Sequence, residues 1–192
     1  MKKLVTLCLV LVMVLSMAAC GNRNEVTPTE PDAALVEVPG SALEILETVW
    51  ALYGDDEKFP VMGGDTNNMV DGAPGTFDHT DAEMLTYQLL VPENQAANID
   101  EAASLFHGMM LNNFTCGVFH VAGNANDFAD AMVGAVKNNQ WRCGFPDTML
   151  VTIIGGEYVL MAFGINDAMN PFTAKLLEAY PNAQTVANEA IA

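Results

Sequence analysis

Apolar residues recur at helical spacing in two long segments of the chain. Over residues 41–53, Ser41 and Glu44 form a capping box ahead of an apolar stripe, which predicts a helix. The same spacing predicts a second helix over residues 127–138, with Asn126 as its cap. Each helix would bury one apolar face against the rest of a domain.

Two further helices are predicted mainly from the residues at their ends. Thr80 and Glu83 form a capping box for a short helix that stops before Pro92. Closer to the C-terminus, Asn170 caps a predicted helix over 171–180, and the proline at its first position loses no hydrogen bond there. The polar residues after this helix are expected to fray.

Continuous apolar runs over residues 150–154 and 158–163 predict a hairpin of buried strands. Gly155 and Gly156 lie between the two runs and favour a tight turn. Because neither run alternates between polar and apolar residues, both faces of these strands are expected to be covered.

Residues 99–111 fit either a helix or a strand. A helix would be capped by Asn98, whereas a strand would pair with residues 115–121 across an Asn-Asn turn. Gly108 would cost a helix about 1 kcal/mol relative to alanine, which favours the hairpin.

Residues 55–79 are predicted to form a long polar loop, which is unusual in a compact domain unless it is functional or mobile. Asp65, Asn67 and Asp71 in this loop superficially resemble a calcium-binding loop, but the expected glycine and the closing glutamate are missing. Turn formation is the simpler role for these residues, and a weak calcium site is the alternative.

The elements follow the order helix, helix, hairpin, helix, hairpin, helix. This order predicts an α+β fold, with a small mostly antiparallel sheet built from two hairpins and helices packed on it. Hydrophobic residues make up 51% of the chain, enough for a real core, and residues 41–192 are predicted to form a single domain.

The first twenty residues follow a different pattern. Lys2 and Lys3 precede an apolar run that ends at Leu15 and is too short for a membrane span, which needs about 20 residues. Small residues follow, as in a cleaved targeting segment. Because Cys20 comes directly after two alanines, the segment resembles a bacterial lipoprotein signal peptide.

The lipoprotein resemblance implies a processed and lipidated N-terminus. Residues 1–19 would be removed, and Cys20 would become the first residue and carry two acyl chains of the palmitate type, which together anchor a protein stably. Residues 20–40, which contain three prolines, would form a flexible tether. The expected location is the cell membrane, on its extracytoplasmic side.

The charge of the chain limits its partners. It has 24 Asp and Glu residues against 7 Lys and Arg, a formal net charge of −17. This charge argues against binding to nucleic acid and against direct contact with anionic lipid head groups. The expected partners are therefore the membrane, through the lipid on Cys20, and a peptide, protein or small-molecule ligand.

Two cysteines remain in the predicted domain, Cys116 and Cys143. Outside the cell membrane they are expected to form a disulfide, which would stabilise the fold by roughly 3–4 kcal/mol on the chain-entropy model. Two buried free thiols are the alternative. The chain has no Cys-x-x-Cys sequence, which argues against a thioredoxin-like redox role.

The histidines provide weak candidates for chemistry. In the predicted hairpin, His107 would lie opposite Val118 and His120 opposite Leu105, on one face near Cys116. These three side chains could bind a transition metal, or Cys116 could act as a nucleophile beside a histidine. The spacing matches no recognised metal or catalytic motif, so structural histidines are the favoured interpretation, and no metal or cofactor is predicted.

Three sequence stretches carry a second resemblance. Residues 109–119, 140–146 and 156–159 are similar to small uncharacterised lipoproteins of Firmicute-type bacteria, which carry a domain of unknown function after a similar leader. The similarity covers roughly residues 80–180. It implies a surface lipoprotein and brings no catalytic residues with it.

The sequence favours a non-enzymatic binding or interaction module. No phosphate-binding, dinucleotide-binding or hydrolase motif occurs. A surface enzyme that uses Cys116 with His107 or His120, and a structural cell-envelope protein, are the alternatives. Four methionines could line an apolar groove, although filling the core is their more common role: Met109, Met110, Met149 and Met161.

Overall fold

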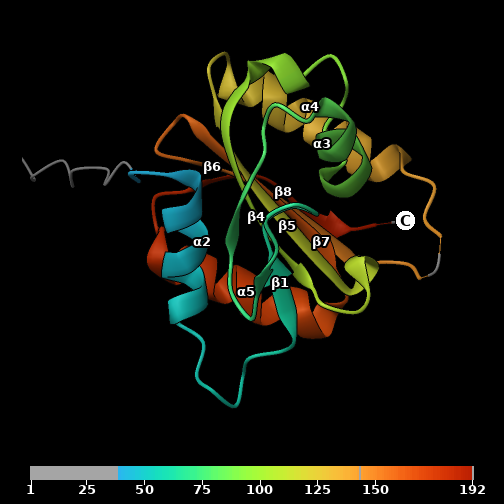
Figure 1. Ribbon diagram of the computed structural model, residues 1–192. Coiled ribbons are helices and arrows are strands. Elements are labelled where there is room, and N and C mark those ends of the chain that lie inside the picture. The colour runs from blue at the N-terminus through green and yellow to red at the C-terminus, as the bar shows by residue number, and fades with distance from the viewer. Residues whose placement is uncertain (1–38, 143, 192) are drawn as a thin grey trace, which may run out of the picture. The chain divides into compact units, whose positions relative to one another are not determined.

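The computed structural model describes residues 39–142 and 144–191, and it has an α+β fold (Figure 1). An eight-stranded antiparallel sheet has the order β2-β1-β4-β5-β7-β6-β8, with β3 also paired to β4. The strands are β1 (Val61–Gly63), β2 (Val70–Asp71), β3 (Gly75–Phe77), β4 (Ile99–His107), β5 (Phe114–Val121), β6 (Thr148–Ile154), β7 (Tyr158–Gly164) and β8 (Gln184–Ala190). The α-helices are α2 (Ala42–Ala51), α3 (Ala82–Leu89), α4 (Ala125–Asn138) and α5 (Asn166–Ala179), with short 3₁₀ turns η1 (Ala96–Asn98) and η2 (Leu111–Asn113).

Helices cover both faces of the sheet, so there are two hydrophobic cores. Helices α2 and α5 lie on one face, and α3 and α4 lie on the other (Figure 1). Alternate residues of a strand point to opposite faces, so Phe114 and Val118 of β5 pack with α2 and α5, whereas Phe119 and Val121 pack with α3 and α4. This double coverage explains the continuous apolar runs of the central strands.

The two predicted hairpins form the centre of the sheet. β6 and β7 are joined at Gly155 and Gly156, both of which have positive φ angles. β4 and β5 also pair, so 99–107 is a strand and the hairpin interpretation is confirmed. The connection between them is longer than a two-residue turn, because residues 108–113 leave the ladder and include η2.

The longer connection changes the predicted register of β4 and β5. Val118 pairs with Ala103, not with His107, and His120 pairs with Glu101. His107 instead pairs with Val61 of β1. The predicted register was wrong because it assumed that the turn consists of two asparagines alone.

Two segments predicted to be irregular contain strands. The expected loop over 55–79 includes β1, β2 and β3. The expected frayed tail forms β8, which pairs with β6 along the edge of the sheet. These strands have only two to seven residues and few fully buried side chains, so they lack the apolar pattern that identifies a strand in sequence.

The helix caps differ from prediction at three of four helices. Ser41 caps α2 as expected, and its Oγ accepts a hydrogen bond from the N–H of Glu44. Asp81 caps α3 in place of Thr80, and Asn124 caps α4 two residues before the predicted cap. The Asp81 side chain accepts from the N–H of Met84 and the Asn124 side chain accepts from the N–H of Asn126, so both serve as caps of the usual type.

Helix α5 begins five residues earlier than predicted, so Pro171 lies inside it. The early start is held by tertiary contacts: the N–H of Asn166 donates to Oδ2 of Asp147, and Oδ1 of Asn166 accepts from the Thr148 hydroxyl. Such long-range hydrogen bonds replace a local cap and do not appear in a sequence pattern.

Residues 1–38 lie outside the described residues, and with them Cys20, the predicted signal peptide and most of the tether. In the described part of the chain, none of the helices has the length and apolar character needed to cross a membrane. The lipid anchor therefore stays a prediction from the sequence.

Candidate functional site

The two candidate metal-binding histidines lie at opposite ends of the β4–β5 pair. His107 is opposite Val61 at the β1 end, and His120 is opposite Glu101 at the other end. Across residues 39–142 and 144–191, no three His, Cys, Asp or Glu side chains come close enough to hold a metal ion. The constellation predicted from the hairpin is therefore not assembled.

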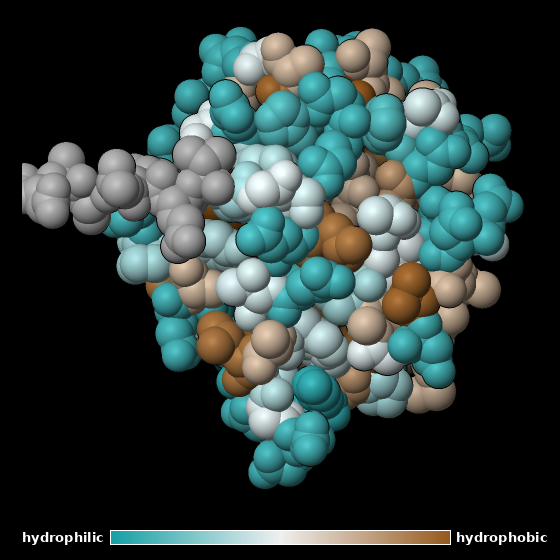
Figure 2. Space-filling view, turned by 60° about the vertical axis from the view of Figure 1, so that its left-hand side comes forward, coloured by the Kyte–Doolittle hydropathy of each residue, from teal (hydrophilic) through white to brown (hydrophobic). Residues whose placement is uncertain are grey.

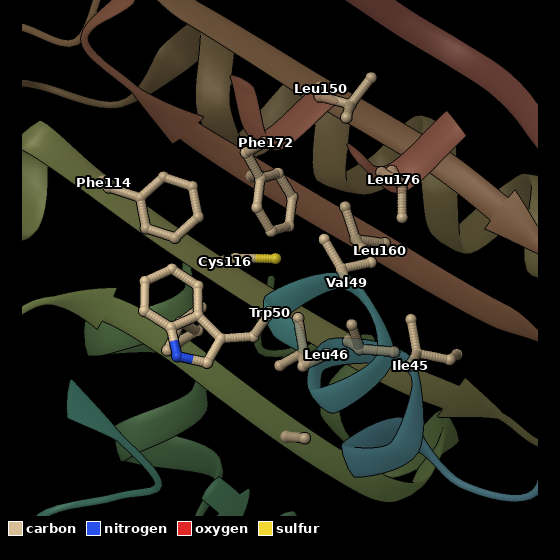
Figure 3. Close-up of a cluster of buried hydrophobic side chains, with 14 of the residues drawn as sticks. Ile45, Leu46, Val49, Trp50, Phe114, Cys116, Leu150, Leu160, Phe172 and Leu176 are labelled. Carbon is tan, nitrogen blue, oxygen red and sulfur yellow. The ribbon is translucent and has the colours of Figure 1, made fainter. Parts of the chain in front are cut away.

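The sulfur of Cys116 is buried among aromatic and aliphatic side chains of the α2–α5 core (Figure 3). Burial raises the pKa of this thiol well above its usual value, so the nucleophilic thiolate is suppressed. His120 is four residues along the same strand, about 13 Å away at 3.3 Å per residue. The two side chains therefore cannot form a nucleophile–base pair. Cys143 lies outside the described residues, so its pairing with Cys116 stays a prediction.

Asp65 organises the segment between β1 and β3. The residue is only 3% exposed, and Oδ1 accepts hydrogen bonds from the N–H groups of Asn67 and Asn68 at 2.7 and 3.0 Å. Oδ2 accepts from the N–H of Asp78 at 3.0 Å. Asp71 is exposed on β2. Because both oxygens of Asp65 already accept backbone hydrogen bonds, this geometry supports the turn interpretation over the calcium site.

His120 is held between two carboxylates at one end of the sheet. Its Nδ1 is hydrogen-bonded to Oδ1 of Asp100, and its Nε2 lies 3.5 Å from Oε2 of Glu157. The Tyr158 ring packs against the imidazole at 4.8 Å between centroids. The hydrogen bond to Asp100 is the largest cause of a raised pKa for His120, with Glu157 adding to it.

This cluster predicts a pH-dependent contribution to stability. The pKa of His120 is higher in the folded than in the unfolded protein, so its protonated form stabilises the fold. This stabilisation is fully present below the unfolded-state pKa of about 6.5 and is lost as the pH rises through the folded-state pKa. We expect His120→Gln to lower the free energy of unfolding more at pH 6 than at pH 9, as measured by urea denaturation. His79→Gln, which leaves this cluster intact, is the control. An equal loss at both pH values would contradict the prediction.

A cleft of about 590 Å³ lies beside Trp141, on the α3–α4 side of the sheet. Three segments far apart in sequence form its walls: the end of α3, the β4–β5 connection and the chain that follows α4 (right-hand side of Figure 1). We call it the Trp141 cleft. It is lined by Thr86, Tyr87, Gln88, Leu90, Met109, Met110, Leu111, Asn112, Asn139, Trp141, Arg142 and Phe163.

Local contacts fix the walls of the Trp141 cleft. Nδ2 of Asn112 donates to the carbonyl oxygens of Arg142 and Gly144, at 2.7 and 2.9 Å, which joins two of the three segments. The Trp141 ring packs edge-on against Phe163 of β7, with 4.8 Å between centroids. The cleft is thus built on the sheet and braced by hydrogen bonds.

Three residues that line the Trp141 cleft carry unpartnered polar atoms. Within the described residues, five buried side-chain polar atoms have no hydrogen-bond partner, and three of them belong to cleft residues. They are Oγ1 of Thr86, Oε1 of Gln88 and Nε1 of Trp141. These three atoms are themselves inaccessible to solvent, so they are exceptions to the rule that buried polar groups are hydrogen-bonded, and they do not identify a ligand.

The charge of the Trp141 cleft is opposite to that of the chain. Its lining contains Arg142 and no Asp or Glu, although the chain has 24 acidic residues. Among the described basic residues, Lys137 pairs with Glu189 and Lys175 pairs with Glu57. Lys58 lies over the Trp50 ring, and Arg142 has no carboxylate partner among the described residues. The guanidinium of Arg142 is therefore available to an anionic group.

Large apolar side chains stand at the rim of the Trp141 cleft. Tyr87 is 77% exposed and Met109 is 81% exposed, and both line the cleft. By contrast, most of the face shown in Figure 2 is hydrophilic, with apolar residues scattered over it. Of the four methionines considered from the sequence, Met149 and Met161 fill the core, whereas Met109 and Met110 line the cleft.

Sequence reasoning missed the cleft as a whole, because its walls meet only in the folded chain. Two sequence features could have indicated it. One is the pair of methionines in the β4–β5 connection, and the other is Trp141 and Arg142 in a connector with few other large side chains. No protein-family model, curated protein or solved structure matches the chain.

Proposed function

We propose that this protein is a lipid-anchored, extracytoplasmic binding module whose ligand site is the Trp141 cleft. The observation that carries the proposal is a cleft of about 590 Å³ whose described lining is largely apolar and includes one charged side chain, that of Arg142. The anchor and the location rest on the sequence of the first twenty residues, with Cys20 as the lipidated residue.

Binding is better supported than catalysis. The one thiol that the structure describes is buried, its pKa is raised, and no histidine lies within hydrogen-bonding reach of it along its strand. Among the described residues that line it, the Trp141 cleft has hydrogen-bonding groups and a cation but no carboxylate, histidine or thiol. This composition favours recognition of a ligand over a chemical step.

The cleft is tested with 1-anilinonaphthalene-8-sulfonate, an apolar aromatic anion whose fluorescence rises on binding to apolar surface. We expect saturable binding, weakened at least tenfold by Met110→Asp, which would place a carboxylate in the cleft. Met69→Asp is the matched control, since Met69 is also an exposed methionine but lies outside the cleft. Equal binding by the two variants would refute the assignment of the site.

The anchor is tested by cell fractionation. We expect the natural chain to sediment with membranes and Cys20→Ser to appear in the soluble fraction, because the variant lacks the sulfur that would carry the acyl chains. Membrane retention of Cys20→Ser would overturn the lipoprotein assignment and leave the cleft assignment intact.

A further inference from the structure

Exposed apolar side chains gather around the Trp141 cleft. Nine large hydrophobic residues are exposed in the described part of the chain, and four of them line this cleft. A fifth, Phe145, is 75% exposed and follows Gly144, where a Cβ would lie only 3.7 Å from Cε of Met110. We call these five residues the Tyr87 patch: Tyr87, Met109, Met110, Leu111 and Phe145.

The Tyr87 patch is large enough for one side of a protein interface. From their exposed fractions, its five residues present on the order of 500 Å² of surface, which is near the upper end for the largest apolar patch of a monomer. A stable interface buries about 800 Å² on each partner, a little over half of it apolar. The patch therefore has the apolar area that a protein partner would cover.

Charges of opposite sign lie on the two sides of Tyr87. Arg142 lines the Trp141 cleft. A neighbouring depression of about 670 Å³ shares only Thr86 and Tyr87 with that cleft and is lined by Glu83 and Glu93. Within residues 39–142 and 144–191, none of these three charged side chains forms an ion pair.

This arrangement is complementary to itself. In a two-fold symmetric dimer a patch meets its own copy, so a group on one side of the axis faces the group from the other side. With the axis close to Tyr87, Arg142 of each copy would face Glu83 and Glu93 of the other. The net charge of −17 opposes association at long range, but salt screens this repulsion beyond about 8 Å at physiological ionic strength.

We propose that the Tyr87 patch is the interface of a two-fold symmetric homodimer, in which Arg142 of each copy pairs with Glu83 or Glu93 of the other. The dimer goes beyond the proposed function, because it requires no ligand. It would place the two Trp141 clefts face to face across the axis. Anchoring through Cys20 would favour it further, since two copies held on one membrane have a high effective concentration.

Sedimentation equilibrium of the purified Cys20→Ser protein tests the interface. We expect a monomer–dimer equilibrium below about 0.5 mM. Phe145→Asp should raise the dissociation constant at least tenfold, because it would bury a carboxylate without a partner in the patch. Met69→Asp is the matched control and should dimerise normally, since Met69 is 57% exposed and lies outside the patch.

Exchange of charges between two variants tests the two-fold arrangement. Arg142→Glu alone, and the double variant Glu83→Arg and Glu93→Arg alone, should each dimerise at least tenfold more weakly, because like charges then face each other at both ends of the interface. A mixture of the two variants should form a heterodimer, because both contacts become attractive again. Lys137→Glu makes the same charge change outside the patch, so it should form homodimers and gain no affinity for the double variant.

Four results would overturn the dimer. The Cys20→Ser protein could remain monomeric at about 0.5 mM, a concentration high enough to populate a weak interface. Phe145→Asp could associate as strongly as Met69→Asp. Either charge variant could dimerise normally by itself. Finally, the two charge variants could fail to combine although circular dichroism shows both to be folded.

The dimer and the ligand site can fail separately. Phe145 does not line the Trp141 cleft, so a monomeric Phe145→Asp protein should still bind the anilinonaphthalene dye. Dye binding without any dimer would leave the proposed function standing and refute the interface. A dimer that Phe145→Asp dissociates, in a protein that binds no dye, would support the interface and refute the ligand site.

Discussion

Gly63→Ala is expected to lower the free energy of unfolding by roughly 3 kcal/mol or more, because it forces a side chain against backbone atoms. A Cβ at this position would lie 2.2 Å from the amide nitrogen of Gly75 and 2.4 Å from the carbonyl carbon of Pro74. β1 and β3 pair with consecutive stretches of the same edge of β4, so the clash can be relieved only by breaking one of these ladders. Urea denaturation followed by circular dichroism measures the loss.

Gly134→Ala is the matched control for this experiment. No atom lies within 4 Å of the position that its Cβ would occupy, and Gly134 lies inside α4. Replacing a helical glycine with alanine stabilises a helix by up to about 1 kcal/mol. The two Gly→Ala changes are therefore expected to shift stability in opposite directions. A Gly63→Ala protein as stable as the natural chain would show that β1 and β3 do not pack as closely as described.

The contrast between these glycines shows what the sequence can predict. Helix α4 and the β6–β7 hairpin are local structures, and their apolar spacing and turn glycines identify them from the sequence alone. The close approach of Gly63 to Gly75 depends on both residues meeting at β4. Nothing in the residues around Gly63 marks it as different from a loop glycine.

The same reasoning separates the predicted site residues from the observed cleft. The predicted metal site assumed a strand register that placed Cys116 near His107 and His120. The six-residue connection between β4 and β5 changes this register, and the two histidines lie at opposite ends of the strand pair. Gln88 and Trp141 lie on segments 53 residues apart and had no chemical motif to connect them. Their proximity arises from the packing of α3 and α4 on one face of the sheet.

Asp65→Ala is expected to lower the free energy of unfolding by about 3 kcal/mol, since it removes the acceptor of three backbone hydrogen bonds. Each N–H group left without a partner in a buried position costs about 1–3 kcal/mol, and partial access to water lowers the total. Asp65→Asn should cost less than alanine, because its amide oxygen can still accept from Asn67 and Asn68. Its amide N–H₂, however, faces the N–H of Asp78 and cannot accept from it.

Asp71→Ala separates this structural role from cation binding. Asp71 is exposed on β2, so its replacement should change stability by no more than about 0.5 kcal/mol. If the oxygens of Asp65 serve the backbone alone, neither Ca²⁺ nor a chelator should shift the thermal midpoint of the natural chain. A rise in the thermal midpoint on adding Ca²⁺ that is abolished by both Asp65→Ala and Asp71→Ala would instead establish the calcium site. Because a cation would have to compete with three N–H donors for the same two oxygens, we expect the Asp65 variants to be destabilised equally with and without Ca²⁺.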